Sequence, residues 1–383
     1  MSEKSNIPSI RFAGFTDPWE QRKFSDLTDR ISIQSSDPDL PQVEYEDIIS
    51  GMGTLNKDLC DKEGGKTGIK FYAGDVLYGK LRPYLMNWLY PQFNGVAVGD
   101  FWVLRATECD SSFLYRLVQT GSFQKLANVS SGSKMPRADW NLISQSFFAV
   151  PADHAEQKAI AKSLAELDSL ITLHQRKHDK LVVLKKSMLE QMFPQEGESV
   201  PKVRFAGFTD PWEQRKLGEI ADSFSGGTPD ASNTTYYGGN IPFIRSAEIN
   251  SSGTGLSLTQ EGLERSAAKL VNRGTILYAL YGATSGEVGI ARLDGAINQA
   301  ILAILPNNDS DSFFIANWLR KEKASIIDTY LQGGQGNLSG AIVRSLVLRL
   351  PSLSEQQRIG TFFSRLDSLI TLHQRKHMRF AFA

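Results

Sequence analysis

The chain has 383 residues, 41% hydrophobic and 22% charged, which is enough for two or three globular domains with full-sized cores. Its 42 basic residues balance its 42 acidic ones, which argues against a strong stand-alone nucleic-acid binder. The sequence shows no signal-peptide core, no membrane-spanning run and no paired-cysteine motif at Cys60 or Cys109, so we expect a cytoplasmic protein without membrane contact.

The chain repeats itself. Residues 11–23 read RFAGFTDPWEQRK, and residues 204–216 repeat all thirteen letters. Residues 167–178 read LDSLITLHQRKH, and residues 366–377 repeat them. Two such blocks in the same order indicate an internal duplication. Because the blocks are identical while the segments between them have diverged, recombination among related genes explains the pattern better than drift.

The repeat predicts four parts. They are a lead with a variable domain (1–150), a central spacer helix (151–200), a second lead and variable domain (201–350), and a shortened C-terminal spacer helix (351–383). We call the variable segments 24–150 and 217–350 the first head and the second head. The predicted fold class is α+β, with two α/β heads separated by long antiparallel, coiled-coil-like helices and an internal pseudo-twofold repeat.

In the first head, short apolar runs such as FWVLRA between Gly, Pro and Asp turns predict short, irregular strands with a few helices. The head carries 12 basic and 15 acidic residues, so any DNA-binding cations must cluster on one face or be helped by partner chains. The stretch from Tyr78 to Tyr84 holds two cations and two aromatics in seven residues, and a polar loop, SSGSKMPR, spans 130–137. Such loops suit phosphates and base edges, although surface loops of any enzyme look similar.

The central helix has a capping-box spacing at Asp153 and Glu156, which Ser352 and Glu355 repeat before the second helix. Apolar residues then recur at spacings of 3, 4 and 7, as in a coiled-coil seam. Nearly forty helical residues would span about 60 Å and need a partner along their length. We expect the two helices to pack through Ile160, Leu164, Leu167, Ile171, Ile359, Phe363, Leu366 and Ile370.

The second head has the same character as the first. It carries 10 basic and 12 acidic residues, a helical pattern at 312–331, and polar glycine-rich loops at 225–233, 281–286 and 332–340. In the C-terminal helix His373 and His377 repeat His174 and His178, at seam positions where apolar residues are expected. A polar layer that fixes helix register explains these histidines better than a metal site, so no metal is predicted.

No catalytic centre is predicted. Asp17-Pro18-Trp19 lacks the second proline of an adenine-methyltransferase motif, and Gly65-Lys66-Thr67 lacks the first glycine of a phosphate loop. The sequence shows no nucleophile with a matching base.

Several motifs fall in one order along the chain: the paired leads, GDVLYGKLRPYL, GGTP…IPFIRSAEI, YGATSGEVGI…GAINQAI, and the repeated P-x-x-x-x-EQ-x-x-I…LDSLI helices. This pattern, which covers essentially the whole chain, resembles the specificity subunits of type I restriction-modification systems. The resemblance implies two target-recognition domains that read a bipartite site in double-stranded DNA. It also implies helices that set the spacing and dock two methyltransferase subunits, with restriction and translocase subunits completing the complex.

The resemblance further implies that methyl donor, ATP and Mg²⁺ belong to those partners, and that this chain holds no cofactor. The DNA-binding residues that it suggests are Lys80, Arg82, Tyr84, Lys134 and Arg137 in the first head, and Arg245, Tyr281, Ser285, Gln335 and Asn337 in the second. The alternatives are a stand-alone bipartite DNA-binding protein and a protein-interaction scaffold.

Overall fold

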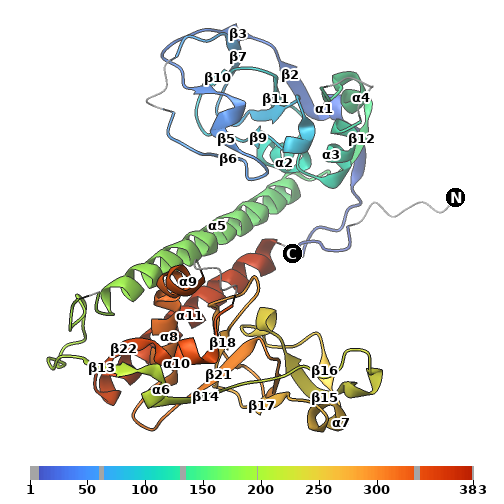
Figure 1. Ribbon diagram of the computed structural model, residues 1–383. Coiled ribbons are helices and arrows are strands. Elements are labelled where there is room, and N and C mark those ends of the chain that lie inside the picture. Colours follow the sequence, from blue (N-terminus) through green and yellow to red (C-terminus); the bar gives the residue numbers. More distant parts are fainter. Residues whose placement is uncertain (1–7, 60–63, 130–134, 196, 332–336, 382–383) are drawn as a thin grey trace. The chain divides into compact units, whose positions relative to one another are not determined.

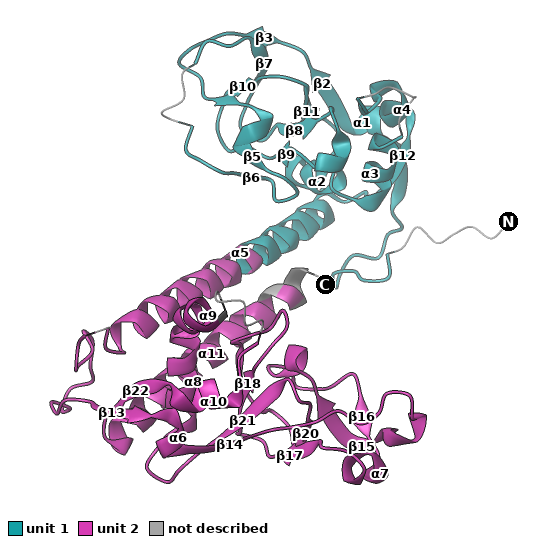
Figure 2. Ribbon diagram, viewed as in Figure 1, with its two compact units in different colours: residues 1–170 teal, residues 171–383 magenta. Residues whose placement is uncertain are grey.

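The computed structural model describes residues 8–59, 64–129, 135–195, 197–331 and 337–381. The chain divides into two compact units, residues 1–170 and residues 171–383 (Figure 2). Each unit contains one head, and none of the described helices has the length and hydropathy of a membrane span.

Unit 1 is built on two four-stranded sheets (Figure 1). The antiparallel sheet β2-β11-β8-β9 comprises β2 (Thr28–Ile31), β11 (Phe101–Ala106), β8 (Val76–Gly79) and β9 (Trp88–Leu89). The mixed sheet β3-β7-β10-β4 comprises β3 (Gln34–Ser35), β7 (Gly68–Phe71), β10 (Gly95–Ala97) and β4 (Gln42–Val43). A hairpin adds β5 (Ile48–Ile49) and β6 (Thr54–Leu55), and β1 (Glu20–Lys23) pairs with β12 (Phe147–Val150).

The helices of unit 1 begin where short polar side chains cap them. The Asp110, Thr120 and Asp139 side chains accept backbone N–H groups at the starts of α2, α3 and α4, which satisfies donors that have no partner inside the helix. The helices are α1 (Phe24–Leu27), α2 (Ser111–Leu117), α3 (Gly121–Ala127) and α4 (Trp140–Gln145).

Unit 2 repeats this plan. Its antiparallel sheet β14-β21-β18-β19 comprises β14 (Ala221–Ser225), β21 (Ile301–Pro306), β18 (Ile276–Ala279) and β19 (Val288–Ile290). Its mixed sheet β16-β15-β20-β17 comprises β16 (Ser257–Leu258), β15 (Tyr237–Ile244), β20 (Gly295–Ile297) and β17 (Lys269–Val271). The ladder β13 (Glu213–Lys216) with β22 (Val347–Leu350) matches β1 with β12, and the head's helices are α6 (Leu217–Ile220), α7 (Gln260–Glu264), α8 (Ser312–Lys321), α9 (Lys323–Leu331) and α10 (Gly340–Ser345). The helical pattern at 312–331 is therefore two helices, with Glu322 capping the first.

In both heads the antiparallel sheet separates two cores. Successive side chains of a strand point to opposite faces, so Tyr78 joins one core while Leu77 joins the other. Tyr278 and Leu277 divide in the same way in the second head. This explains why these strands read as continuous apolar runs.

The heads differ in where the mixed sheet gains its fourth strand. The strands β7-β10-β4 and β17-β20-β15 match in order and direction, including one parallel pair each. In the first head β3 joins beside β7, whereas in the second head β16 joins beside β15, at the opposite edge. The two mixed sheets therefore share three strands and differ in the edge at which the fourth strand is added.

The spacer helices are α5 (His154–Gln191) and α11 (Leu353–Ala381). Glu156 does not close a capping box; its carboxylate accepts two 2.7 Å hydrogen bonds from the Arg11 guanidinium in the lead. Glu355 binds Arg204 of the second lead in the same way, at 2.7 and 2.8 Å. Each repeated lead is thus fastened to its own helix by a bidentate ion pair.

The glutamine after each of these glutamates binds the head. The Gln157 side chain accepts from the Asp110 N–H at 2.7 Å and donates to the Pro151 carbonyl at 2.8 Å. Gln356 makes the matching bonds with Asp311 and Pro351. The repeated Glu-Gln pair therefore joins lead, head and helix in both units.

Within unit 2 the second half of α5 and α11 run antiparallel, because His174 meets His373 while Lys185 meets Asp367. Of the residues expected to pack, Ile359, Phe363 and Leu366 are buried in the second-head core. Ile160 packs against the first-head core, Leu164 is 39% exposed, and Leu167, Ile171 and Ile370 are half-buried. The first turns of each helix thus bind a head, and the contacts His174–His373 and Lys185–Asp367 lie further along both helices.

Candidate nucleic-acid interface

In the first head, the loops that follow β4, β8 and β10 meet a fourth segment, residues 135–138. Lys80 N–H donates to the Asp100 carbonyl at 2.9 Å, Arg82 N–H to Pro136 at 2.8 Å, and Ala138 N–H to Lys80 at 2.8 Å. The Tyr45 hydroxyl donates to the Asp100 carbonyl and accepts from Leu81 N–H. We call this surface, residues 44–45, 80–86, 98–100 and 135–138, the first edge.

Two of the predicted DNA-binding cations share one carboxylate on the first edge. Lys80 Nζ lies 3.5 Å from Asp100 Oδ1, and Arg137 Nη2 lies 3.0 Å from Asp100 Oδ2. Asp100 was not predicted from the sequence; its only signal was a Gly-Asp turn before an apolar strand. It holds both cations at the surface, where the Arg137 side chain stays 59% exposed.

The loop after β8 contains two non-glycine residues with left-handed backbone. Arg82 has φ 49° and Met86 has φ 54°, on either side of the turn Pro83–Leu85. Such conformations are unfavourable for residues with a Cβ and concentrate at functional sites. Among the residues that the structure describes, the exposed Arg82 guanidinium has no hydrogen-bond or ion-pair partner, and Tyr84 beside it is 53% exposed.

The second head builds the same surface from different side chains. Leu280 N–H donates to the Ala300 carbonyl and Leu338 N–H to Leu280, at 2.8 and 2.9 Å. The bridge between Tyr281 and Asn337 repeats the bridge between Leu81 and Arg137. We call residues 245–248, 280–286, 298–300 and 337–338 the second edge.

Glycines occupy the left-handed positions of the second edge. Gly282 and Gly286, with φ 82° and 76°, stand where the first edge has Arg82 and Met86. Ser285 closes the turn by donating from its hydroxyl to the Gly282 carbonyl at 3.0 Å. The second edge thus repeats the two left-handed positions of the first edge with glycines, which adopt this conformation without steric strain.

Arg245 lies at the end of β15, and its guanidinium binds Glu248 at 3.0 and 3.1 Å. These hydrogen bonds lower the pKa of Glu248 to about 2, so the pair stays charged. Asn298, at the end of β20, was not predicted; its buried amide oxygen has no hydrogen-bond partner among the described residues. The structure therefore places Arg245, Tyr281, Ser285 and Asn337 on one framework, while Lys134 and Gln335 lie outside the described residues.

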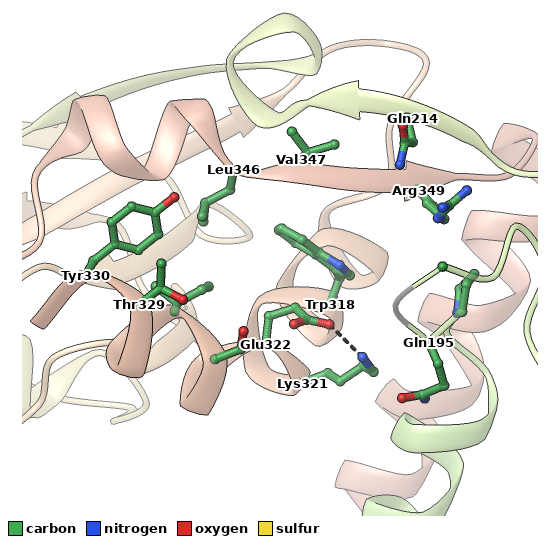
Figure 3. A pocket seen from close by; sticks show the side chains of 14 residues that line it. Gln195, Gln214, Trp318, Lys321, Glu322, Thr329, Tyr330, Leu346, Val347 and Arg349 are labelled. Atoms are coloured by element: carbon green, nitrogen blue, oxygen red, sulfur yellow. Dashed lines mark hydrogen bonds and ion pairs between the residues drawn. The ribbon is translucent and has the colours of Figure 1, made fainter. Parts of the chain in front are cut away.

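A separate polar pocket of about 540 Å³ lies in unit 2 between α8, α9 and the β13–β22 ladder (Figure 3). Gln214 and Arg349 line it from the ladder, and Lys321 forms a 2.6 Å ion pair with Glu322 at its wall. Glu322 is the single carboxylate among the described lining residues, so they offer no free acid–base pair. Across the described part of the chain, no group of three or more His, Cys, Asp or Glu side chains is placed to hold a metal ion.

Comparisons with known proteins agree with this architecture. Residues 209–378 match the family described as type I restriction modification DNA specificity domain. The type I restriction enzyme MjaIX specificity subunit of Methanocaldococcus jannaschii is 26% identical over 167 residues, which are 42% of this chain and 38% of that protein. The MjaVIII specificity subunit of the same organism is 24% identical over 286 residues, 70% of this chain and 65% of the relative. The matched region therefore covers less than two thirds of either relative.

Among solved structures, the crystal structure of a type I restriction-modification system S subunit from M. genitalium is similar over 99% of this chain and 96% of its own. It has a TM-score of 0.60 and 14% sequence identity, which shows a shared fold. Residues 209–378 thus match the type I restriction modification DNA specificity domain, and the whole chain has the fold of the M. genitalium S subunit.

Proposed function

We propose that the first and second edges each read one half of a bipartite site in double-stranded DNA, and that the chain directs partner methyltransferase and restriction subunits to that site. One observation carries the proposal: the two edges share a backbone framework but present different chemistry. The first edge has the cations Lys80, Arg82 and Arg137, and the second has Tyr281, Asn337 and the Arg245–Glu248 pair. Two domains that recognise different half-site sequences in the same geometry require a shared backbone and different side chains at the DNA-binding surface.

The side chains at each edge suit base and phosphate contacts. Arginine and lysine match the acceptors of guanine and the phosphates, whereas asparagine amides match adenine. Arg82 is the best candidate for a base or phosphate contact in the first head, because it is exposed and has no partner among the described residues. On the second edge Asn337 has the place that Arg137 has on the first, since it pairs with Tyr281 as Arg137 pairs with Leu81.

In this proposal the chain is not itself an enzyme, and methyl donor, ATP and Mg²⁺ belong to partner subunits. The balanced charge supports help from partners, because strong autonomous DNA binding draws on an excess of cations. Two methyltransferase subunits would dock on the spacer helices, where apolar side chains are exposed that no head covers: Leu170, Leu173, Val182, Val183 and Leu184 on α5, and Leu369, Leu372 and Met378 on α11.

The test is DNA binding by the assembled complex of this chain with its partner methyltransferase. Binding to a duplex that carries the complete site should exceed binding to a scrambled duplex at least 1,000-fold, as about 4 kcal/mol of specificity requires. The variant Asn337→Ala should weaken binding to the site without changing binding to the scrambled duplex. Equal affinity for both duplexes would exclude sequence reading, and full specificity without the methyltransferase would indicate a stand-alone binder.

A further inference from the structure

The two identical leads have different surroundings. Trp212 of the second lead is 3% exposed in the second-head core, whereas Trp19, the same residue of the first lead, is only half-buried. The difference does not come from the way the leads are fastened, because Arg11 and Arg204 bind their glutamates at the same 2.7 Å. A neighbour present at one lead must therefore be missing at the other.

In the second head that neighbour is the last turn of α5 together with Met192 and Phe193, which follow the helix. The Phe193 ring lies 6.2 Å from the rings of Trp212 and Phe363 and 5.2 Å from Phe314. Met192 is buried beside it, and Met188 and Leu189 pack against the same core one turn earlier. The helix end therefore fills the space between the lead, the head and α11 with apolar side chains.

None of the described residues fills the matching space in the first head. A hollow of about 100 Å³ remains there, lined by Ile10, Arg11, Phe12, Trp19, Glu156 and Ile160. Leu164, which matches the fully buried Phe363, is 39% exposed at the same surface. The apolar positions that are covered in one repeat are thus open in the other.

A carboxylate marks the edge of this surface in both repeats. In the second head Asp367 accepts a 2.5 Å bond from Lys185 of α5 and lies 3.8 Å from Arg320. In the first head Asp168 takes the place of Asp367 and binds Arg116 at 2.6 Å, but it has no lysine partner among the described residues. An occupant would therefore meet an acidic side chain one to two turns before its apolar end.

We infer that this surface of the first head is a docking site for a helix of a partner protein, different from this chain, that carries the pattern Lys-x-x-Met-Leu-x-x-Met-Phe. The second head defines that pattern through Lys185, Met188, Leu189, Met192 and Phe193. The sequence contains the pattern once, and that copy is buried in the second head. The inference is independent of DNA reading.

The test is titration of the full chain with a labelled synthetic peptide of residues 179–195. We expect saturable one-to-one binding, accompanied by a change in tryptophan fluorescence as Trp19 becomes covered. The same peptide with Met192→Asp and Phe193→Asp is the control and should not bind. In the protein, Leu164→Glu should weaken binding at least tenfold, whereas Leu173→Glu, an exposed leucine of the same helix outside this surface, should leave it unchanged.

Three outcomes would overturn the inference. The first is no binding, and the second is binding that Leu164→Glu does not affect, which would place the peptide elsewhere, for example in the second head by exchange. The third is a dimer in light scattering that Leu164→Glu converts to a monomer, because the occupant would then be a second copy of this chain. Circular dichroism of Leu164→Glu verifies that the variant is folded.

Discussion

At the scale of single residues, the Glu-Gln pair at the start of each spacer helix connects the parts of each repeated unit. Its glutamate binds the lead arginine, and its glutamine binds the head and the strand that precedes the helix. Both glutamate side chains are only 1% exposed, so each depends on its arginine for compensation. The duplicated residues are therefore those that connect the parts of one unit.

Removal of one lead arginine should destabilise its unit strongly. In Arg204→Ala the buried Glu355 loses its counter-charge, and breaking such a pair costs about 3–5 kcal/mol. Chemical denaturation should show this loss in the transition of unit 2. The matched control is Arg215→Ala, which breaks the exposed pair with Glu219 and should leave the free energy of unfolding nearly unchanged. Equal effects of the two variants would contradict the role of the lead.

Because the backbone at Arg82 is left-handed, substitution of this residue by glycine should affect protein stability and DNA binding differently. Arg82→Gly relieves the strain, so the free energy of unfolding should stay level or rise by up to about 1 kcal/mol. DNA affinity of the assembled complex should nevertheless fall, and the slope of log affinity against log salt should decrease by about one. Met86→Gly, at the second left-handed position, relieves similar strain without removing a charge and should leave the salt slope unchanged. An unchanged slope in Arg82→Gly would remove Arg82 from the interface.

At the scale of elements, periodicity predicted both spacer helices and their antiparallel pairing, but not their register. Ile160 and Ile359 repeat each other in sequence, yet each packs against the head of its own unit. A heptad-like stripe records that a helix face is buried and does not identify the surface that buries it. The paired turns lie later, where His174 meets His373.

The histidine contact predicts that acid weakens the helix pair. Burial lowers the pKa of His373, and the positive charges of His174, Lys177, Lys376 and His178 lower it further. As the pH falls below the ordinary value of 6.5, the unfolded chain therefore takes up the proton before the folded pair does, and stability is lost over the interval down to the lowered pKa. The melting temperature of unit 2 should fall between pH 7.5 and 5.5.

Two variants check this pH dependence. His373→Gln removes the group whose pKa is shifted and should flatten the pH dependence of the melting temperature. His154→Gln changes an exposed histidine at the start of α5 and should leave it as in the original chain. A pH dependence that survives His373→Gln would assign the effect to other groups.

Some features of the two heads could be predicted from the sequence, and others could not. Short apolar runs predicted the α/β character, and the cations and aromatics from Tyr78 to Tyr84 suggested nucleic-acid contacts. Lys80, Arg82 and Tyr84 lie on the first edge, whereas Tyr78 is buried in β8. The partner loop around Arg137 and the role of Asp100 depended on contacts between segments about 20 to 60 residues apart, which no local pattern encodes. The opposite placement of β3 and β16 was equally hidden, because two-residue strands leave almost no periodic signal.

At the scale of the whole molecule, the duplicated framework and the different side chains of the two edges support the proposal that each head recognises its own half-site. Each unit joins a lead, a head and a spacer helix through the same hydrogen bonds, while the exposed side chains of the two edges differ. If the edges act independently, changes on one edge should alter recognition of one half of the site only. Free energies of variants at separate sites should then add to within about 0.5 kcal/mol.

Additivity can be measured with one variant on each edge. In the assembled complex, Arg137→Ala and Asn337→Ala should each weaken binding to the complete site, and the double variant should lose the sum of the two free energies. The comparison requires both halves of the site in one duplex and a constant salt concentration, because phosphate contacts depend on salt. A double variant that binds no worse than either single variant would mean that the two edges contact the same half.

The most direct measurement of the central claim is a genome-wide map of methylated adenines in cells that express this chain with its partner methyltransferase. The proposal predicts a split motif with a fixed gap that disappears when the gene for this chain is deleted. Replacement of the first head, residues 24–150, should change one half of the motif and leave the other half and the gap as before. A complex that forms but methylates no motif, or a replacement that alters both halves, would contradict the proposal that each head reads its own half-site.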